Sequence, residues 1–220
     1  MMAVRMTVFI ALLVVGFGAL LFGGAGRLDL PWLWAYLVGW ALYAGVSSGL
    51  SVWLNPTLMA ERMKPPSDRD RLTRRLAVGP CLAHLVVAGL DARYGWSSMP
   101  VTLRLLGFAS MTLAWSLIAW TFATNRFASS AVRIQTERNH EVITTGPYAI
   151  VRHPMYLGVF LTVLGSPLAL GSWWALLVVS PVALIFVRRT RLEDRMLHDE
   201  LPGYAEYARR TRYRIVPGIF

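Results

Sequence analysis

The sequence has almost no cysteine and too little charge for a typical soluble protein. Cys81 is the single cysteine, so an internal disulfide cannot form. Charged residues make up only 15% of the chain and come in blocks between long uncharged runs, whereas 55% of the residues are hydrophobic. This composition excludes an ordinary soluble domain and predicts one integral-membrane domain over residues 1–220.

Several familiar binding motifs are also missing. The sequence contains no CxxC, HExxH or other metal-ligand spacing, so we expect no bound metal. Gly16-Phe17-Gly18 lacks the third glycine and the strand context of a dinucleotide fingerprint, and favours helix packing instead. The net charge of +10 is better explained by arginine-rich loops that face anionic lipid than by nucleic acid, which we do not expect as a partner.

The apolar runs have the lengths of membrane spans. A helix needs about 20 apolar residues to cross the hydrocarbon core. The last long stretch is interrupted twice, by Gly165-Ser166-Pro167 and by Gly171-Ser172, which predicts a tight hairpin of short or tilted spans. We therefore predict an all-α, polytopic membrane helix bundle of five to six transmembrane helices, over Met6 to Ala25, Leu30 to Leu54, Leu76 to Leu90, Val101 to Ala123 and the hairpin Met155 to Val187.

The cations indicate how the bundle is oriented. If the chain crosses the membrane six times, 19 of the 22 lysine and arginine residues lie on the same side as the N-terminus. The other three are Arg27, Arg93 and Arg104. Cytoplasmic loops carry an excess of Lys and Arg. We therefore predict a multi-pass protein of the cell inner (cytoplasmic) membrane, in contact with the lipid bilayer and with both the N- and C-termini in the cytoplasm.

The densest polar motif begins at Gly146-Pro147-Tyr148 and continues through Arg152-His153-Pro154-Met155-Tyr156-Leu157-Gly158. Proline suits the first turn of a helix, so His153 is expected near the N-cap, where backbone N–H groups and the helix dipole favour an anionic ligand group. Tyr156 and Gly158 follow on the first turns, and glycine lets a ligand approach closely. An equally simple interpretation is an interface patch of Arg, His and Tyr side chains.

Two further clusters accompany this motif. Arg189 and Glu193 are four residues apart and therefore share a helix face, which by itself fits a surface ion pair. The loop from Gln135 to Ile143 ends just before the motif and is placed to fold over a ligand there, although its polar residues are also compatible with an ordinary loop.

Together, these residues resemble the integral-membrane methyltransferases, the family of isoprenylcysteine carboxyl methyltransferases and phospholipid methyltransferases. The resemblance covers Gln135 to about Pro217 and rests on the Gly146 to Gly158 motif, on Arg189-x-x-x-Glu193-Asp194, and on Gly203-Tyr204-x-x-Tyr207. It implies S-adenosylmethionine as methyl donor and S-adenosylhomocysteine as product, bound at the cytoplasmic face. Residues 1–124 would then form N-terminal helices, and residues 125–220 the cofactor-binding and catalytic part.

The resemblance also implies roles for individual residues. Arg189 would face the methyl acceptor and, with Glu193, carry the catalytic role. Asp194 stands where the family usually has a second glutamate, which leaves its role open. The implied cofactor contacts are Gln135, His140, Glu141, Val142, Ile143, Tyr148, His153, Pro154, Met155, Tyr156, Gly158, Glu193 and Asp194.

The chemistry of the acceptor is left partly open. We expect a lipophilic or small-molecule acceptor, with the carboxylate of an isoprenylcysteine-like compound favoured, because an ionised carboxylate needs no base. A thiol or amine would need help from His153 or Tyr148. The alternatives are an NADPH-dependent membrane reductase of the sterol-reductase type and a non-enzymatic membrane protein or transporter, although the latter usually carries its polar groups at mid-membrane.

Overall fold

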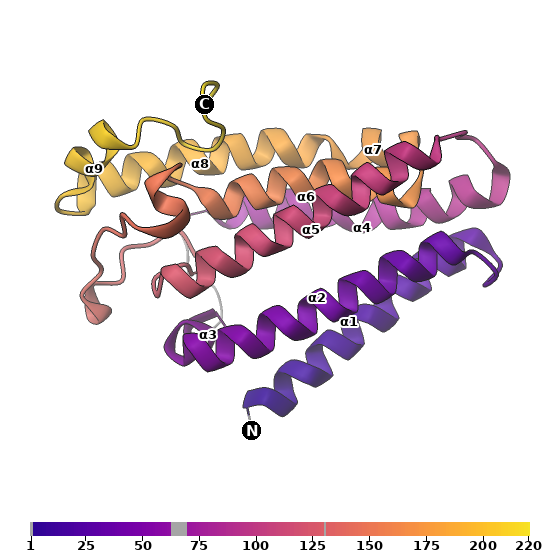
Figure 1. The fold of residues 1–220 in the computed structure, drawn as a ribbon, viewed down its shortest axis with the longest axis horizontal. Coiled ribbons are helices and arrows are strands. Elements are labelled where there is room, and N and C mark those ends of the chain that lie inside the picture. The colour runs from indigo at the N-terminus through magenta and orange to yellow at the C-terminus, as the bar shows by residue number, and fades with distance from the viewer. Residues whose placement is uncertain (1, 63–69, 130) are drawn as a thin grey trace.

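The computed structural model describes residues 2–62, 70–129 and 131–220, and within these ranges every regular element is a helix (Figure 1). The all-α prediction is therefore confirmed. The α-helices and the two short 3-10 helices, η1 and η2, are α1 (Met2–Ala25), α2 (Pro31–Leu54), α3 (Pro56–Arg62), α4 (Arg71–Tyr94), α5 (Val101–Thr124), η1 (Thr136–Arg138), η2 (Gly146–Ala149), α6 (Pro154–Leu170), α7 (Trp173–Val179), α8 (Pro181–Glu200) and α9 (Tyr204–Arg210).

Four of the described helices, α1, α2, α4 and α5, are long and apolar enough to cross a membrane. Helix α4 is longer than the predicted Leu76 to Leu90 because both of its ends are capped. The Asp70 side chain accepts a hydrogen bond from the Thr73 N–H at the start, and Gly95, in the left-handed conformation, ends the helix. The chain is thus a polytopic helical membrane protein, as predicted.

The predicted hairpin is present, but its turn lies at only one of the two expected positions. Helix α6 continues through Gly165-Ser166-Pro167 and ends at Gly171, whose φ of 77° suits glycine. The Ser172 side chain then caps α7, and Ser180 separates α7 from α8. Helix α8 extends to Glu200, so it carries the Arg189 and Glu193 cluster away from the turn.

Close helix contacts hold the bundle together. A Cβ atom on Gly107 of α5 would lie 2.3 Å from the backbone nitrogen of Ala169 in α6. One on Gly89 of α4 would lie 2.1 Å from the carbonyl oxygen of Leu21 in α1. Backbones that meet this closely are typical of membrane helices, where small residues allow tight packing.

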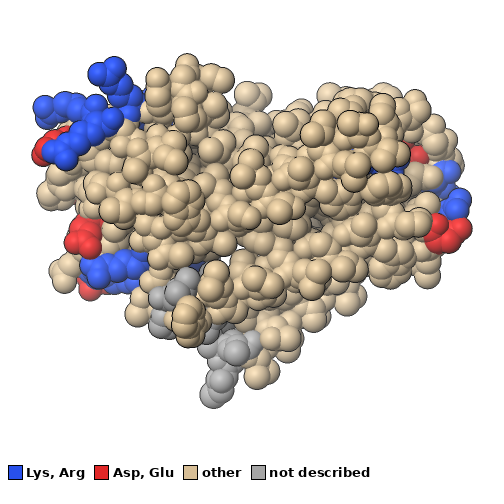
Figure 2. Space-filling model, viewed as in Figure 1, with Lys and Arg blue, Asp and Glu red and all other residues tan. Residues whose placement is uncertain are grey.

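Charged side chains gather at the two ends of the molecule, with a broad uncharged band between them on the face seen in Figure 2. At one end, Arg27 forms an ion pair with Asp29 (2.6 Å), and Arg93 and Arg104 belong to the neighbouring ends of α4 and α5. The other end holds the start of α6, the end of α8 and α9 (Figure 1). Among the cations assigned to this end, Lys64, Arg69 and the side chain of Arg5 lie outside the described residues.

Candidate active site

The start of α6 is fixed by the last part of the chain. His153 is the N-cap and Pro154 the first helical residue, as predicted. The backbone N–H of His153 donates to the carbonyl of Arg214 (2.8 Å), and that of Arg152 donates to the carbonyl of Tyr213 (2.9 Å). The tail thus stabilises the extended residues directly before the helix.

Tyr148 is positioned by the 3-10 helix η2. Gly146 begins this helix with a φ of 59°, and a side chain there would meet Thr124. The Tyr148 hydroxyl accepts a hydrogen bond from Asn125 Nδ2 (2.7 Å), and its carbonyl accepts one from the Tyr207 hydroxyl (2.7 Å). Burial raises the pKa of the Tyr148 hydroxyl above its usual range, so this group is neutral at physiological pH.

Tyr156 of α6 and Glu193 of α8 connect these two helices. The Tyr156 hydroxyl donates a hydrogen bond to Glu193 Oε2 and accepts one from Arg189 Nε (2.9 Å). The Tyr156 ring also stacks on the His153 ring, with centroids 5.7 Å apart. Arg189 and Glu193 are linked through the Tyr156 hydroxyl and form a partly buried network rather than a surface ion pair.

The loop before the motif folds around Gln135. This side chain is 1% exposed; it donates to the Phe127 carbonyl (2.8 Å) and accepts from Arg138 (2.6 Å). The Gln135 N–H donates to His140 Nδ1 (3.3 Å), which requires that nitrogen to be unprotonated. Burial, helped by the charges of Arg138 and Arg133, lowers the pKa of His140 to about 4.

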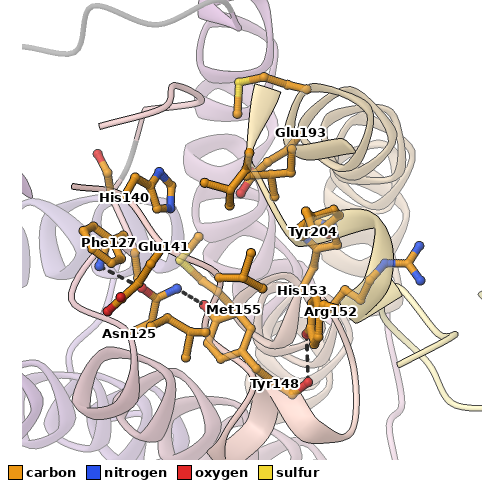
Figure 3. A pocket seen from close by; sticks show the side chains of 18 of the residues that line it. Asn125, Phe127, His140, Glu141, Tyr148, Arg152, His153, Met155, Glu193 and Tyr204 are labelled. Carbon is orange, nitrogen blue, oxygen red and sulfur yellow. Dashed lines mark hydrogen bonds between the residues drawn. The ribbon is translucent and has the colours of Figure 1, made fainter. Parts of the chain in front are cut away.

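These elements enclose a cleft at the end of the bundle that holds α9 and the start of α6. Figure 3 shows Asn125, Phe127, His140 and Glu141 on one side, and His153 and Glu193, from the start of α6 and from α8, on the other. Nine of the predicted site residues line the cleft: His140, Glu141, Val142, Ile143, Tyr148, His153, Met155, Tyr156 and Glu193.

The remaining predicted residues are not among those that line the cleft. The Gln135 side chain is hydrogen-bonded to the Phe127 carbonyl within the loop, and Pro154 is the first residue of α6. Gly158 does not offer its backbone to a ligand, because it faces α5, where a Cβ atom would lie 2.5 Å from Ile118 Cγ1. Arg189 is buried and contacts the Tyr156 hydroxyl, and its expected place beside the methyl acceptor stays a prediction.

Asp194 also faces away from the cleft. Its carboxylate is 2% exposed and accepts hydrogen bonds from Arg152 (2.9 and 3.0 Å), His153 (3.2 Å), Tyr204 (2.9 Å) and Arg214 (2.7 Å). Burial raises the pKa of this carboxyl, but the hydrogen bonds from His153, Arg152 and Arg214 outweigh that effect and lower it below its usual range. Asp194 thus links α8 to the start of α6, to α9 and to the tail around Arg214.

Several cleft residues were missed by the sequence analysis. Asn125 follows the end of α5, and Phe127 and Arg133 belong to an irregular segment without a recognisable pattern. Tyr204 and Tyr207 were part of the motif but were given no role, although α9 brings both to the cleft. Within the part of the chain that the structure describes, no group of three His, Cys, Asp or Glu residues is arranged to hold a metal ion.

Comparison with known proteins agrees with the motif. Residues 102–201 match the family model described as phospholipid methyltransferase. The protein-S-isoprenylcysteine O-methyltransferase of Schizosaccharomyces pombe is 36% identical over 70 residues, which cover 31% of this chain and 30% of the yeast protein. The resemblance to the integral-membrane methyltransferases is therefore confirmed.

Two bacterial relatives match a larger share of the chain. The cobalt-zinc-cadmium resistance protein CzcN of Cupriavidus metallidurans is 33% identical over 64% of this chain and 63% of its own length, which is less than two thirds. The nickel-cobalt-cadmium resistance protein NccN of Alcaligenes xylosoxydans xylosoxydans is 26% identical over 74% of this chain and 72% of its own length.

Proposed function

We propose that this chain, which carries a phospholipid methyltransferase domain over residues 102–201, transfers a methyl group from S-adenosylmethionine to a lipophilic or small acceptor. The reaction would take place at the cytoplasmic face of the inner membrane. The observation that carries the proposal is the cleft itself. It brings Glu193 of α8, the His153 end of α6 and residues 140–143 of the loop into one lining, and these are the segments in which the methyltransferase motif lies.

The lining suits the different parts of the donor. The Glu193 carboxylate would pair with a cationic group, such as the ammonium. The first turn of α6, at His153 and Met155, would take the carboxylate at the positive end of a helix dipole. Phe127 and His140, whose rings lie 4.5 Å apart, offer aromatic faces for the adenine.

Methyl transfer from a sulfonium is an in-line displacement, so the chain mainly has to align the two reactants and exclude water. A carboxylate acceptor is ionised already and needs no base, which favours an isoprenylcysteine-like carboxylate. A thiol or amine acceptor would have to lose a proton to His153 or Tyr148. The pKa of the Tyr148 hydroxyl is raised, so the neutral form persists and this residue is a poor base at neutral pH.

Binding of the product tests the proposal most directly. Isothermal titration of purified protein in detergent with S-adenosylhomocysteine should give one site. Glu193→Gln should weaken that site at least tenfold, because it removes the negative charge that faces the cleft. Asp199→Asn, an exposed position on the same helix, should bind as the wild type does. Wild-type protein without a binding signal would refute the proposal.

The acceptor is best identified from the labelled product. Membrane extracts and small thiols would be incubated with the protein and S-adenosylmethionine carrying an isotopic methyl label, then separated and analysed by mass spectrometry. Label in an ester would indicate a carboxylate acceptor, whereas label in a thioether or amine would indicate the alternatives. Because two relatives are named as metal-resistance proteins, extracts from cells grown with and without cobalt, zinc, cadmium or nickel should be compared.

A further inference from the structure

A chain of contacts leads from Tyr156, which lines the cleft, to Arg189 and Asp70, which do not. Arg189 Nε donates to the Tyr156 hydroxyl (2.9 Å), while Arg189 Nη1 lies 3.8 Å from Oδ2 of Asp70. Both charged groups are almost fully enclosed, with Arg189 5% and Asp70 1% exposed. The contacts therefore connect the start of α4, through α8 and α6, to the Glu193 carboxylate in the cleft.

Asp70 is not part of any motif in the sequence. It precedes residues 102–201, the segment that matches the methyltransferase family model. Its carboxylate accepts hydrogen bonds from the N–H and the hydroxyl of Thr73, and Arg188 Nη1 lies 2.7 Å from its Oδ1. The Arg188 side chain is half exposed, whereas that of Arg189 is buried, so the two arginines depend on Asp70 to different degrees.

The charges along this chain alternate. Asp70 is negative, Arg189 positive and Glu193 negative, and the neutral Tyr156 hydroxyl lies between the last two. A buried guanidinium is costly unless a negative group compensates it. Without Asp70, the compensation of Arg189 would depend more heavily on Glu193, acting through Tyr156. The Glu193 carboxylate would then be less available to a cation in the cleft.

We propose that Asp70 is a positioning residue for donor binding. By balancing the charge of Arg189, it leaves the Glu193 carboxylate available for the cationic part of the methyl donor. This inference rests on the proposed function, because it needs a cationic ligand beside Glu193. It also places one determinant of donor affinity outside the region that carries the family motif.

A purely structural role for Asp70 is the competing explanation, because the same carboxylate caps α4. Two substitutions separate the roles. Asp70→Asn removes the charge and keeps a good N-cap residue, since asparagine caps helices about as well as aspartate. Thr73→Val removes a hydrogen bond to Asp70 but keeps the charge, and it serves as the matched control for a weakened helix start.

Titration with S-adenosylhomocysteine and thermal unfolding of each variant would decide between the roles. We expect Asp70→Asn to raise the Kd roughly tenfold and also to lower the Tm, because it removes the buried charge partner of Arg189. Thr73→Val should lower the Tm and leave the Kd within about twofold. An unchanged Kd in Asp70→Asn, or an equal rise of the Kd in Thr73→Val, would overturn the proposal.

A double-mutant cycle makes the test independent of the stability of one variant. In an Arg189→Gln background, Asp70→Asn should have no further effect on the Kd, because the charge that Asp70 balances is gone. Additive effects would show that Asp70 does not act through Arg189. If Asp70→Asn unfolds, Asp70→Ser, which also caps helices, takes its place in the cycle. Failure of the wild type to bind S-adenosylhomocysteine would instead refute the proposed function.

Discussion

Asp194 shows how a single carboxylate can hold several elements of the chain together without lining the cleft. Four side chains donate to it, and they come from the residues before α6, from α9 and from the tail. Its neighbour Glu193 points in the other direction and lines the cleft. Adjacent acidic residues on one helix therefore have different surroundings, because Asp194 accepts hydrogen bonds from several elements and Glu193 lines the cleft.

Replacing Asp194 by alanine should destabilise the protein strongly. The change leaves the buried guanidinium of Arg152 without its carboxylate, and breaking a buried ion pair typically costs about 3–5 kcal/mol. Thermal or denaturant unfolding in detergent would measure the loss. Asp199→Asn on the same helix should change the stability by less than about 0.5 kcal/mol. An Asp194→Ala variant as stable as this control would contradict the structural role.

His140 should make stability depend on pH in mildly acidic solution. Its pKa in the folded protein is about 4, below the usual value of about 6.5, so the unfolded chain binds the proton more readily between these values. Stability should therefore fall as the pH is lowered from about 6.5 to 4. The Tm of the wild type, measured over this range, should show a steeper decline than that of His140→Gln. Parallel declines would mean that His140 is not buried in its neutral form.

At the scale of helices, close backbone contacts set how the elements pack. Gly107→Ala would place a methyl group 2.3 Å from the Ala169 nitrogen and push α5 away from α6. We expect a loss of about 1–3 kcal/mol in stability, typical of overpacking. Gly39→Ala in α2 is the control, because a Cβ atom there has no neighbour within 4 Å and alanine favours a helix. Equal unfolding temperatures for the two variants would disprove the tight crossing.

The helices differ in how well the sequence predicts them. Helices α1, α2 and α5 follow from apolar runs of the length of a span, and the start of α6 follows from His153-Pro154. The predicted ends of α4 were wrong because its limits are set by the capping residues and not by hydropathy. The turns beyond the apolar run contain Arg71, Arg74, Arg75 and Arg93. The close packing of Gly158 against Ile118 is a tertiary contact that no local pattern reveals.

The site was predictable where its residues form a motif and hidden where they do not. The segments around His153 and Glu193 carry side chains in fixed spacings, so their meeting in one cleft was expected and is observed. Asn125 and Phe127 enter the same cleft from an irregular connection whose path depends on buried partners such as Gln135. Asp70 lies still further from the motif in sequence, and only the folded arrangement connects it to Arg189.

For the whole molecule, the orientation in the membrane remains a prediction that labelling can test. The proposed function requires the cleft to open toward the cytoplasm, where the donor is proposed to bind. The cleft lies near α9, at the end opposite the Arg27–Asp29 pair. In a Cys81→Ala background, Glu206→Cys on α9 should react with a membrane-impermeant maleimide only after the cells are permeabilised. Asp29→Cys should react in spheroplasts whose inner membrane is intact. The reverse pattern would place the cleft outside the cell, away from its donor, and would refute the proposed function together with the orientation.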